Sequence, residues 1–241
     1  MQIYRGIKLW KLFREYGNLY SKNLKKVFIT MHSKYLNSIN YCYVYMKGEK
    51  RERILQILLE NPEGMLTAYA IHKKAECSQP WALTYLKKLG RMNLIKNTRV
   101  LDVYKLYEHW LQIRTPPEYR EYHLKKDPLS SIKQSTLPYA LTTYRADNIM
   151  NQYLFPTRTD VYILPSDLDG WHSYLTSQGL VGKGNTRILL ADPYIIQHSL
   201  TKHGYSLVST SQLICDLLME GGVAEEAAHR LIRKWYADFI R

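Results

Sequence analysis

Residues 66–96 read LTAYAIHKKAECSQPWALTYLKKLGRMNLIK, and this stretch decides the fold of the N-terminal half. Thr67 is expected to cap a short helix that ends at Ala75, because a threonine hydroxyl can accept a free N–H of the first turn. Ser78 is expected to cap a second helix, with Pro80 in its first turn, where the missing N–H breaks no hydrogen bond. An apolar stripe at helical spacing follows, formed by Ala82, Leu86 and Leu89.

The flanking segments extend this pattern. Apolar residues at helical spacing predict a helix that begins at Glu49 and ends at Asn61-Pro62. Met65-Leu66 is predicted to be extended. After the second helix, residues 92–95 and 100–104 read as two short strands around a polar turn. The order helix, extended segment, helix, turn, helix, hairpin predicts a winged helix-turn-helix.

Residues 49–107 resemble the winged-helix transcriptional regulators of archaea and bacteria, most plainly in the quoted stretch. The resemblance implies a DNA-binding domain over residues 46–110, with double-stranded DNA as its partner. In such a domain the second helix of the motif enters the major groove.

A helix in the major groove must present polar and aromatic side chains opposite its buried stripe. Gln79, Trp81, Thr84, Tyr85 and Lys88 meet this condition, and Gln79 and Thr84 are the candidates for hydrogen bonds to base edges. The side chains expected to neutralise phosphates are Lys73, Lys74, Lys87, Lys88, Arg91, Lys96 and Arg99. Two alternatives stay open: an ordinary solvated helix face, and a winged domain used for dimerisation. Trp81 could also anchor the edge of the core.

Charge is distributed unevenly along the 241 residues. The chain carries 34 Lys and Arg against 21 Asp and Glu, a net charge of +13, which suits a polyanionic partner. Residues 1–45 contain 8 basic and 1 acidic residue, residues 46–110 contain 12 and 7, and residues 111–241 contain 14 and 13. The asymmetry predicts that the N-terminal half meets nucleic acid, while the C-terminal half binds protein or a small molecule.

Cysteine usage and hydropathy bound the cellular setting. Cys42, Cys77 and Cys215 lie far apart without a CxxC pair, so neither a disulfide framework nor a zinc knuckle is indicated. No apolar run approaches the ~18 residues of a membrane span, and the N-terminus lacks the pattern of a secretory signal. These features predict a cytoplasmic protein with no membrane attachment, no metal and no cofactor.

The remaining segments complete a prediction for the whole chain. Residues 1–45 are expected to be a basic, weakly ordered extension. Residues 111–137 are expected to be a linker that ends in a short helix opened by Asp127-Pro128. Residues 138–241 predict a small mixed α/β sheet domain with C-terminal helices, so the chain is expected to be α+β. Its expected strands span 139–143, 160–164, 187–191 and 206–208, and its expected helices span 145–153, 168–178, 212–219 and 224–240.

The segments YALTTYRADNIM (139–150), RTDVYIL (158–164) and LVSTSQLICDLLMEGGVAEEAAHRLI (207–232) carry a second resemblance. They are similar to the C-terminal domain of the AbiEi-type antitoxins, the transcriptional regulators of type IV toxin-antitoxin pairs. The resemblance implies an autorepressor that binds operator DNA and has a toxin-like protein partner. Self-association is the other partner that stays open.

The same order of segments also resembles the core of the nucleotidyltransferase fold, so an enzyme is the alternative. That chemistry needs carboxylates converging on Mg²⁺, commonly as Asp-x-Asp after a Gly-Ser turn. Here Thr142-Thr143 stands where Gly-Ser would be, and Tyr162 stands where the carboxylate after Asp160 would be. Asp167 and Asp169 form an Asp-x-Asp in what reads as a turn and helix cap. No residue is therefore assigned a catalytic role.

Overall fold

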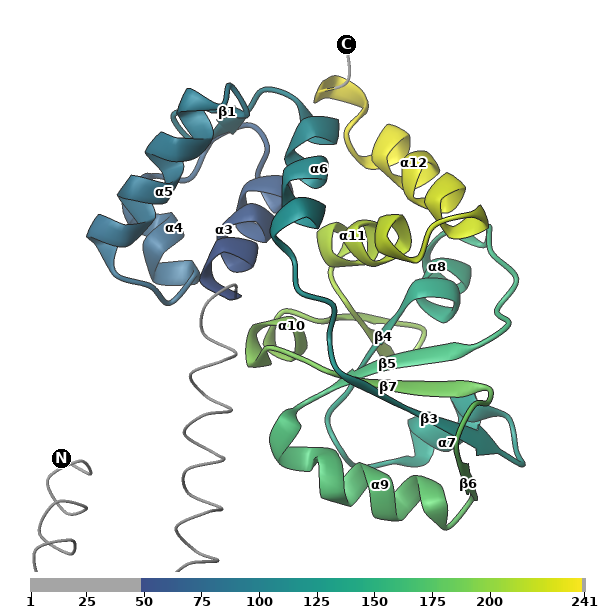
Figure 1. Ribbon diagram of the computed structural model, residues 1–241. Coiled ribbons are helices and arrows are strands. Elements are labelled where there is room, and N and C mark those ends of the chain that lie inside the picture. The colour runs from purple at the N-terminus through teal and green to yellow at the C-terminus, as the bar shows by residue number, and fades with distance from the viewer. Residues whose placement is uncertain (1–48, 240–241) are drawn as a thin grey trace, which may run out of the picture. The chain divides into compact units, whose positions relative to one another are not determined.

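The computed structural model describes residues 49–239, and the predicted extension 1–45 lies outside this range. Three helices and a short hairpin come first along the described chain, followed by a mixture of helices and strands that ends in two helices (Figure 1). The helices are α3 (Glu49–Glu60), α4 (Ala68–Lys74), α5 (Gln79–Arg91), α6 (Val103–Ile113), α7 (Pro128–Gln134), α8 (Thr143–Asn151), α9 (Leu168–Thr176), α10 (Pro193–Gln197), α11 (Thr210–Glu220) and α12 (Val223–Trp235), with 3-10 turns η1 (Pro165–Asp167) and η2 (Ala237–Phe239).

Within residues 49–239 the strands form two sheets. A two-stranded antiparallel hairpin pairs β1 with β2, and seven further strands form a mixed sheet in the order β6-β3-β7-β5-β4-β9-β8. The pairs β5–β7 and β4–β9 are parallel and the others antiparallel. The strands are β1 (Ile95–Lys96), β2 (Arg99–Val100), β3 (Tyr119–Leu124), β4 (Ala140–Thr142), β5 (Thr159–Ile163), β6 (Gly179–Val181), β7 (Thr186–Leu190), β8 (Leu200–Lys202) and β9 (Tyr205–Leu207). The described chain is therefore a mixed α+β protein, as the sequence predicts.

Capping and apolar spacing explain the first helices. The Thr67 hydroxyl accepts a hydrogen bond from the Ala70 N–H at 3.2 Å and caps α4, which confirms its predicted role. Ser78 occupies the N-cap position of α5, but its side chain makes no capping hydrogen bond. The stripe predicted along α5 is buried.

The structure differs from the prediction at two points in this half. Met65-Leu66 lies outside any strand, and residues 103–104, expected to be extended, open α6. Asp102 caps this helix, because its carboxylate accepts from the Lys105 N–H at 3.1 Å. The helix then buries a face formed by Val103, Leu106, Tyr107 and Trp110.

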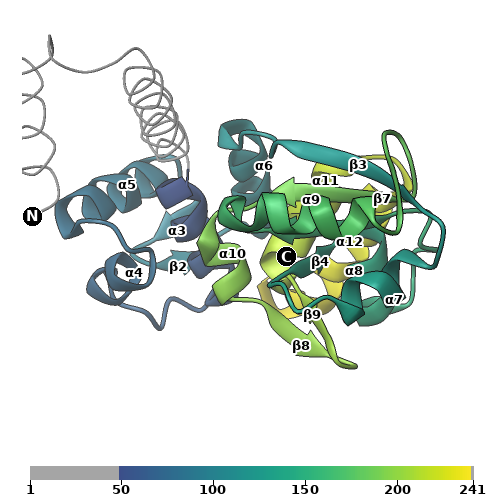
Figure 2. The ribbon, with the colours of Figure 1, turned by 90° about the horizontal axis from the view of Figure 1, so that it is seen from below.

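The seven-stranded sheet lies between two layers of helices. Figure 1 shows α8, α11 and α12 on one side of the central strands and α7 and α9 on the other, and Figure 2 shows α9 across the sheet from below. Every residue of β5 is buried, as expected for a strand covered on both faces. The helices and strands predicted for residues 138–219 are confirmed to within two residues as β4, α8, β5, α9, β7, β9 and α11. The helix predicted over 224–240 corresponds to α12, which ends earlier, at Trp235, and is followed by η2, while residue 240 lies outside the described range. The sequence did not predict β6, α10 or β8.

The segment 111–137, which is expected to be a linker, contributes the strand β3 to the seven-stranded sheet. β3 lies between β6 and β7, and the boundary expected at residue 110 falls inside α6. The Asp127 carboxylate accepts from the Ser130 N–H at 2.9 Å and caps α7, as predicted. Residues 111–137 therefore form β3 and α7 and are not a linker between two domains.

Polar side chains join the N-terminal helices to the sheet region, and the described residues belong to one compact unit. Arg53 on α3 makes two 2.6 Å contacts with Asp192, which precedes α10. Gln56 donates to the Ser209 hydroxyl at 2.8 Å. Such buried polar pairs hold elements in one arrangement. No helix among residues 49–239 has both the length and the apolar character of a membrane span.

Candidate nucleic-acid interface

The helix α5 exposes a polar face opposite its buried stripe. Gln79 and Thr84 are exposed, as are the basic residues of this helix, Lys87, Lys88 and Arg91. The Thr84 hydroxyl donates to the Pro80 carbonyl at 2.8 Å, so its oxygen keeps accepting capacity while its proton is engaged. Gln79, in the first turn, has both its amide donors and its carbonyl available, because it makes no side-chain hydrogen bond within the described residues.

Tyr85 was expected on this exposed face, and that expectation is wrong. Its side chain is buried, with 6% of its surface exposed, and its hydroxyl lies 3.2 Å from Nε2 of His109. Trp81 is half-buried and stacks on the Tyr85 ring at a centroid distance of 5.7 Å. Burial raises the pKa of Tyr85 above its ordinary value, so the phenol stays protonated. Tyr85 therefore fixes α5 to α6, and Trp81 covers the edge of this contact.

The β1–β2 hairpin places two further cations in solvent. Lys96 and Arg99 are exposed, and Asn97 between them adopts a positive φ of 58° that suits a tight turn. The hairpin is fixed to the turn after α3, because the Thr98 hydroxyl donates to the Gly64 carbonyl at 3.1 Å. A Cβ atom at Gly64 would lie 2.7 Å from the Arg99 backbone nitrogen, so only glycine allows this approach.

The predicted phosphate-contacting residues come from four neighbouring elements: α4 touches α5, α5 touches β1, and β1 pairs with β2. Within residues 49–239 none of them forms an ion pair, whereas Arg53, Arg145 and Arg187 elsewhere in the chain do. The only acidic residue in the stretch 66–100 is Glu76, which is paired with Arg53. In the stretch 66–100, the exposed cations that have no carboxylate partner among the described residues are Lys73, Lys74, Lys87, Lys88, Arg91, Lys96 and Arg99. Their charge is therefore available to an external anion.

A histidine lies beneath this surface. His109 on α6 is 6% exposed, and Nδ1 of its ring has no hydrogen-bond partner within the described part of the chain. Burial, together with the charges of Lys88 and Arg51, lowers its pKa below the ordinary value. A neutral imidazole beside Tyr85 is thus the stable form.

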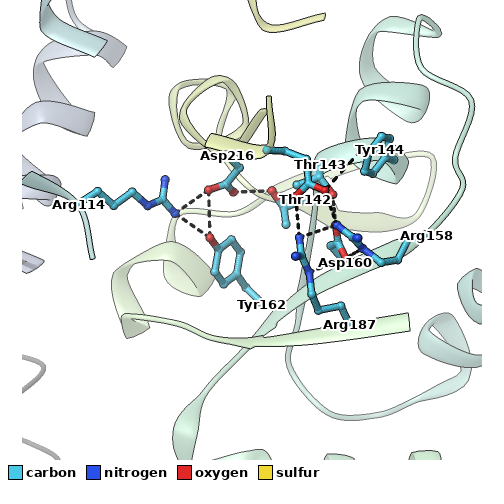
Figure 3. A network of polar contacts seen from close by, with 10 residues as sticks. Arg114, Thr142, Thr143, Tyr144, Arg158, Asp160, Tyr162, Arg187 and Asp216 are labelled. Atoms are coloured by element: carbon cyan, nitrogen blue, oxygen red, sulfur yellow. Dashed lines mark hydrogen bonds and ion pairs between the residues drawn. The ribbon is translucent and has the colours of Figure 1, made fainter. Parts of the chain in front are cut away.

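A second polar cluster occupies the sheet face beneath α11 (Figure 3). The strand register places Thr142, Asp160 and Arg187 opposite one another on β4, β5 and β7. Asp160 is fully buried and accepts from Arg158 at 2.6 Å, from Arg187 at 3.1 Å and from the Thr143 hydroxyl. Both arginines also contact Glu220, at 2.8 and 3.0 Å. Two cations and two carboxylates therefore balance, and the Asp160 oxygens are engaged within the protein.

Asp216 on α11 forms the other half of this cluster. Its carboxylate accepts from Arg114 at 2.6 Å, from the Tyr162 hydroxyl at 3.0 Å and from the Thr142 hydroxyl (Figure 3). Burial, followed by the nearby Asp216 charge, raises the pKa of Tyr162 well above its ordinary value. Sequence reasoning missed Arg114 and Asp216 because their partners lie on elements distant in the chain.

The carboxylates that could have served a nucleotidyltransferase, Asp160, Asp167 and Asp169, each have a different environment. Asp160 binds arginines, Asp167 lies in η1 with one buried oxygen unpartnered among residues 49–239, and Asp169 lies in the first turn of α9. His198 stacks on Tyr194, and His203 occupies the β8–β9 turn. No group of three His, Cys, Asp or Glu side chains within the described range could hold a metal ion.

Comparisons with models of protein families, with curated proteins and with solved structures found no match to this chain.

Proposed function

We propose that this chain is a sequence-specific, DNA-binding transcriptional regulator in which residues 49–113 act as a winged helix-turn-helix. Support comes from the order α3, α4, α5, β1–β2 hairpin, with α5 as the helix that enters the major groove. Its polar face is exposed, and the hairpin after it carries two exposed cations.

The observation that carries the proposal is the group of seven exposed cations on α4, α5 and the hairpin, none of which forms an ion pair with another residue of 49–239. Unpaired like charges repel one another, so a polyanion that neutralises them is bound favourably. Phosphate contacts fix the register of a protein on DNA without reading its sequence. Lys73, Lys87 and Lys88 are proposed to contribute to this positioning.

We propose that Gln79 and Thr84 recognise the DNA sequence by forming hydrogen bonds with base edges. A glutamine can bond an adenine through both the donor and the acceptor of its amide, which distinguishes this base in the major groove. Gln79 lies in the first turn of α5, which is the end of a recognition helix that contacts base edges. Trp81 supports this turn by stacking on Tyr85, and it is not proposed to contact bases.

The C-terminal half is proposed to bind a protein partner, either a toxin-like protein or a second copy of the chain. The edge strand β6 exposes Leu180 and Val181, and unpaired edges of this kind are available for protein contacts. We propose a cytoplasmic autorepressor without catalytic function. The engagement of Asp160 by Arg158 and Arg187 supports a structural role for this carboxylate.

The test is selection of duplexes from a random library by the full chain, followed by fluorescence anisotropy on the enriched and scrambled duplexes. Gln79→Ala is expected to lower the preference at one base position by ~1 to 3 kcal/mol. Lys88→Ala is expected to weaken both duplexes alike. Lys125→Ala, an exposed lysine beyond β3, is the matched control and should bind as the native chain does. Absence of any enriched sequence would overturn the proposal.

A further inference from the structure

A groove of about 760 Å³ lies along α12, at the opposite end of Figure 1 from α4 and α5. It is open to solvent, and its volume is within the range of small-molecule sites. The residues that line it are Tyr153, Glu226, His229, Arg230, Arg233 and Lys234. Four of these six side chains carry basic groups.

The positive charge in this groove is not balanced by its carboxylates. Arg230, Arg233 and Lys234 are exposed and form no ion pair with any residue of the described part. Glu226 accepts a hydrogen bond from the Tyr153 hydroxyl at 3.1 Å, and Glu225 pairs with His229 at 3.7 Å. Like charges four residues apart, as at Arg230 and Lys234, destabilise a helix unless an anion lies between them.

One of the cations is held in place. The Arg230 guanidinium lies 4.2 Å from the centroid of the Tyr153 ring, and the Glu226 hydrogen bond fixes that ring in turn. The helix dipole favours Arg233 and Lys234, which lie in the last turn of α12. The helix dipole does not explain why Arg230 lies one turn earlier, or why the Tyr153 ring lies against its guanidinium.

We propose that the α12 groove is a binding site for a small ligand that carries a phosphate group. A phosphomonoester has a charge of about −1.5 to −2 near neutral pH and three acceptor oxygens, which match the three cations that line the groove. Arg230 and Arg233 bond its oxygens and Lys234 adds charge, while Tyr153 offers an apolar edge to the rest of the ligand. The site does not depend on the DNA contact proposed for α5.

Isothermal titration calorimetry on the full chain tests this site, with inorganic phosphate, adenosine 5′-monophosphate and adenosine as probes. The two phosphate-bearing probes are expected to bind with dissociation constants at or below about 1 mM, and adenosine is expected not to bind. Arg230→Ala, and the double variant Arg233→Ala/Lys234→Ala, should weaken phosphate binding at least about tenfold. All these positions are exposed, and an unchanged thermal midpoint verifies that the variants fold.

Two control variants separate this site from net charge and from DNA binding. Lys125→Ala/Lys126→Ala removes two exposed charges elsewhere and should leave phosphate binding unchanged. Lys87→Ala/Lys88→Ala should lose DNA affinity while keeping phosphate binding, so the two proposals fail independently. Absence of phosphate binding, an equal loss in the Lys125/Lys126 control, or a groove variant that weakens duplex DNA alone would each overturn the proposal. The last result would assign the groove to the DNA backbone.

Discussion

The Arg114 guanidinium lies 2.6 Å from the Asp216 carboxylate, and 4% and 2% of the two side chains are exposed. Arg114 follows α6 and Asp216 belongs to α11, so the pair joins the N-terminal helices to the layer that covers the sheet. Both side chains form further hydrogen bonds: Arg114 donates to the Tyr162 hydroxyl at 2.8 Å, and Gln212 donates to the Asp216 carboxylate at 2.9 Å. The pair therefore connects the two regions through a buried contact, and we expect them to unfold together.

Asp216→Asn is expected to lower the free energy of unfolding by about 3 kcal/mol, because it leaves the buried Arg114 charge without its counterion. Urea unfolding followed by circular dichroism measures this. Asp102→Asn is the matched control: it removes the charge facing Lys105 in a half-exposed pair and keeps the helix cap, so the loss should stay below ~1 kcal/mol. Equal effects of the two substitutions, or two separate transitions in the native chain, would contradict the coupling of the two regions.

Gly64→Ala tests how the β1–β2 hairpin is held. Gly64 has a φ of 79°, and an added Cβ would meet the Arg99 backbone at 2.7 Å, so we expect a loss of at least about 2 kcal/mol in unfolding free energy. Gly204→Ala shares the positive φ of 76°, but its closest neighbour is the flexible end of Lys133 at 3.4 Å. That control should lose about 1 kcal/mol. Thermal unfolding compares the two variants, and a larger loss at Gly204 would refute this account of the hairpin.

Tyr85→Phe separates a structural role from DNA contact. Removing the hydroxyl leaves Nε2 of His109 without its partner and should lower the unfolding free energy by about 1 kcal/mol. DNA affinity, measured by anisotropy below the unfolding range, should be unchanged. A large loss of affinity at unchanged stability would instead place Tyr85 at the DNA, as its sequence pattern suggests.

The lowered pKa of His109 makes stability depend on pH. The unfolded imidazole titrates near ~6.5, so below this pH the unfolded state binds more protons than the folded state. The free energy of unfolding therefore falls as pH drops below about 6.5 and levels off once the folded-state pKa is passed. His109→Gln should flatten this part of the profile in urea titrations from pH ~5 to ~8. If His109→Gln left the pH profile of the unfolding free energy unchanged, the assignment of this pH dependence to His109 would be wrong.

Local pattern predicts α5 and the buried stripe of Ala82, Leu86 and Leu89, but not the burial of Tyr85. Tyr85 lies three residues after Ala82 and four residues before Leu89, on the same helical face. The signal was present in the spacing. An aromatic residue with a polar tip fits both a buried and an exposed position, and only its contact with His109 decides between them.

The residue types at the start of α6 are misleading on their own. Val103 and Tyr104 favour strands by type, whereas the Asp102 cap and the helical spacing of Val103, Leu106, Tyr107 and Trp110 indicate a helix. In β3, buried Tyr122 and Leu124 alternate with exposed neighbours, a period of two that the nearby prolines obscured. The partners of Asp160 and Asp216 come together through strand register and helix packing, which no local pattern specifies.

The most direct test of the proposed function is the salt dependence of DNA binding by the native chain and by Lys87→Ala/Lys88→Ala. Each phosphate contact contributes about 0.9 to the slope of log affinity against log salt concentration, so the variant should have a slope smaller by about 2. Anisotropy titrations between about 50 and 200 mM salt measure it, with Lys125→Ala/Lys126→Ala as the control that keeps the native slope. An identical slope and affinity for the native chain and the Lys87/Lys88 variant would contradict the placement of α5 on DNA.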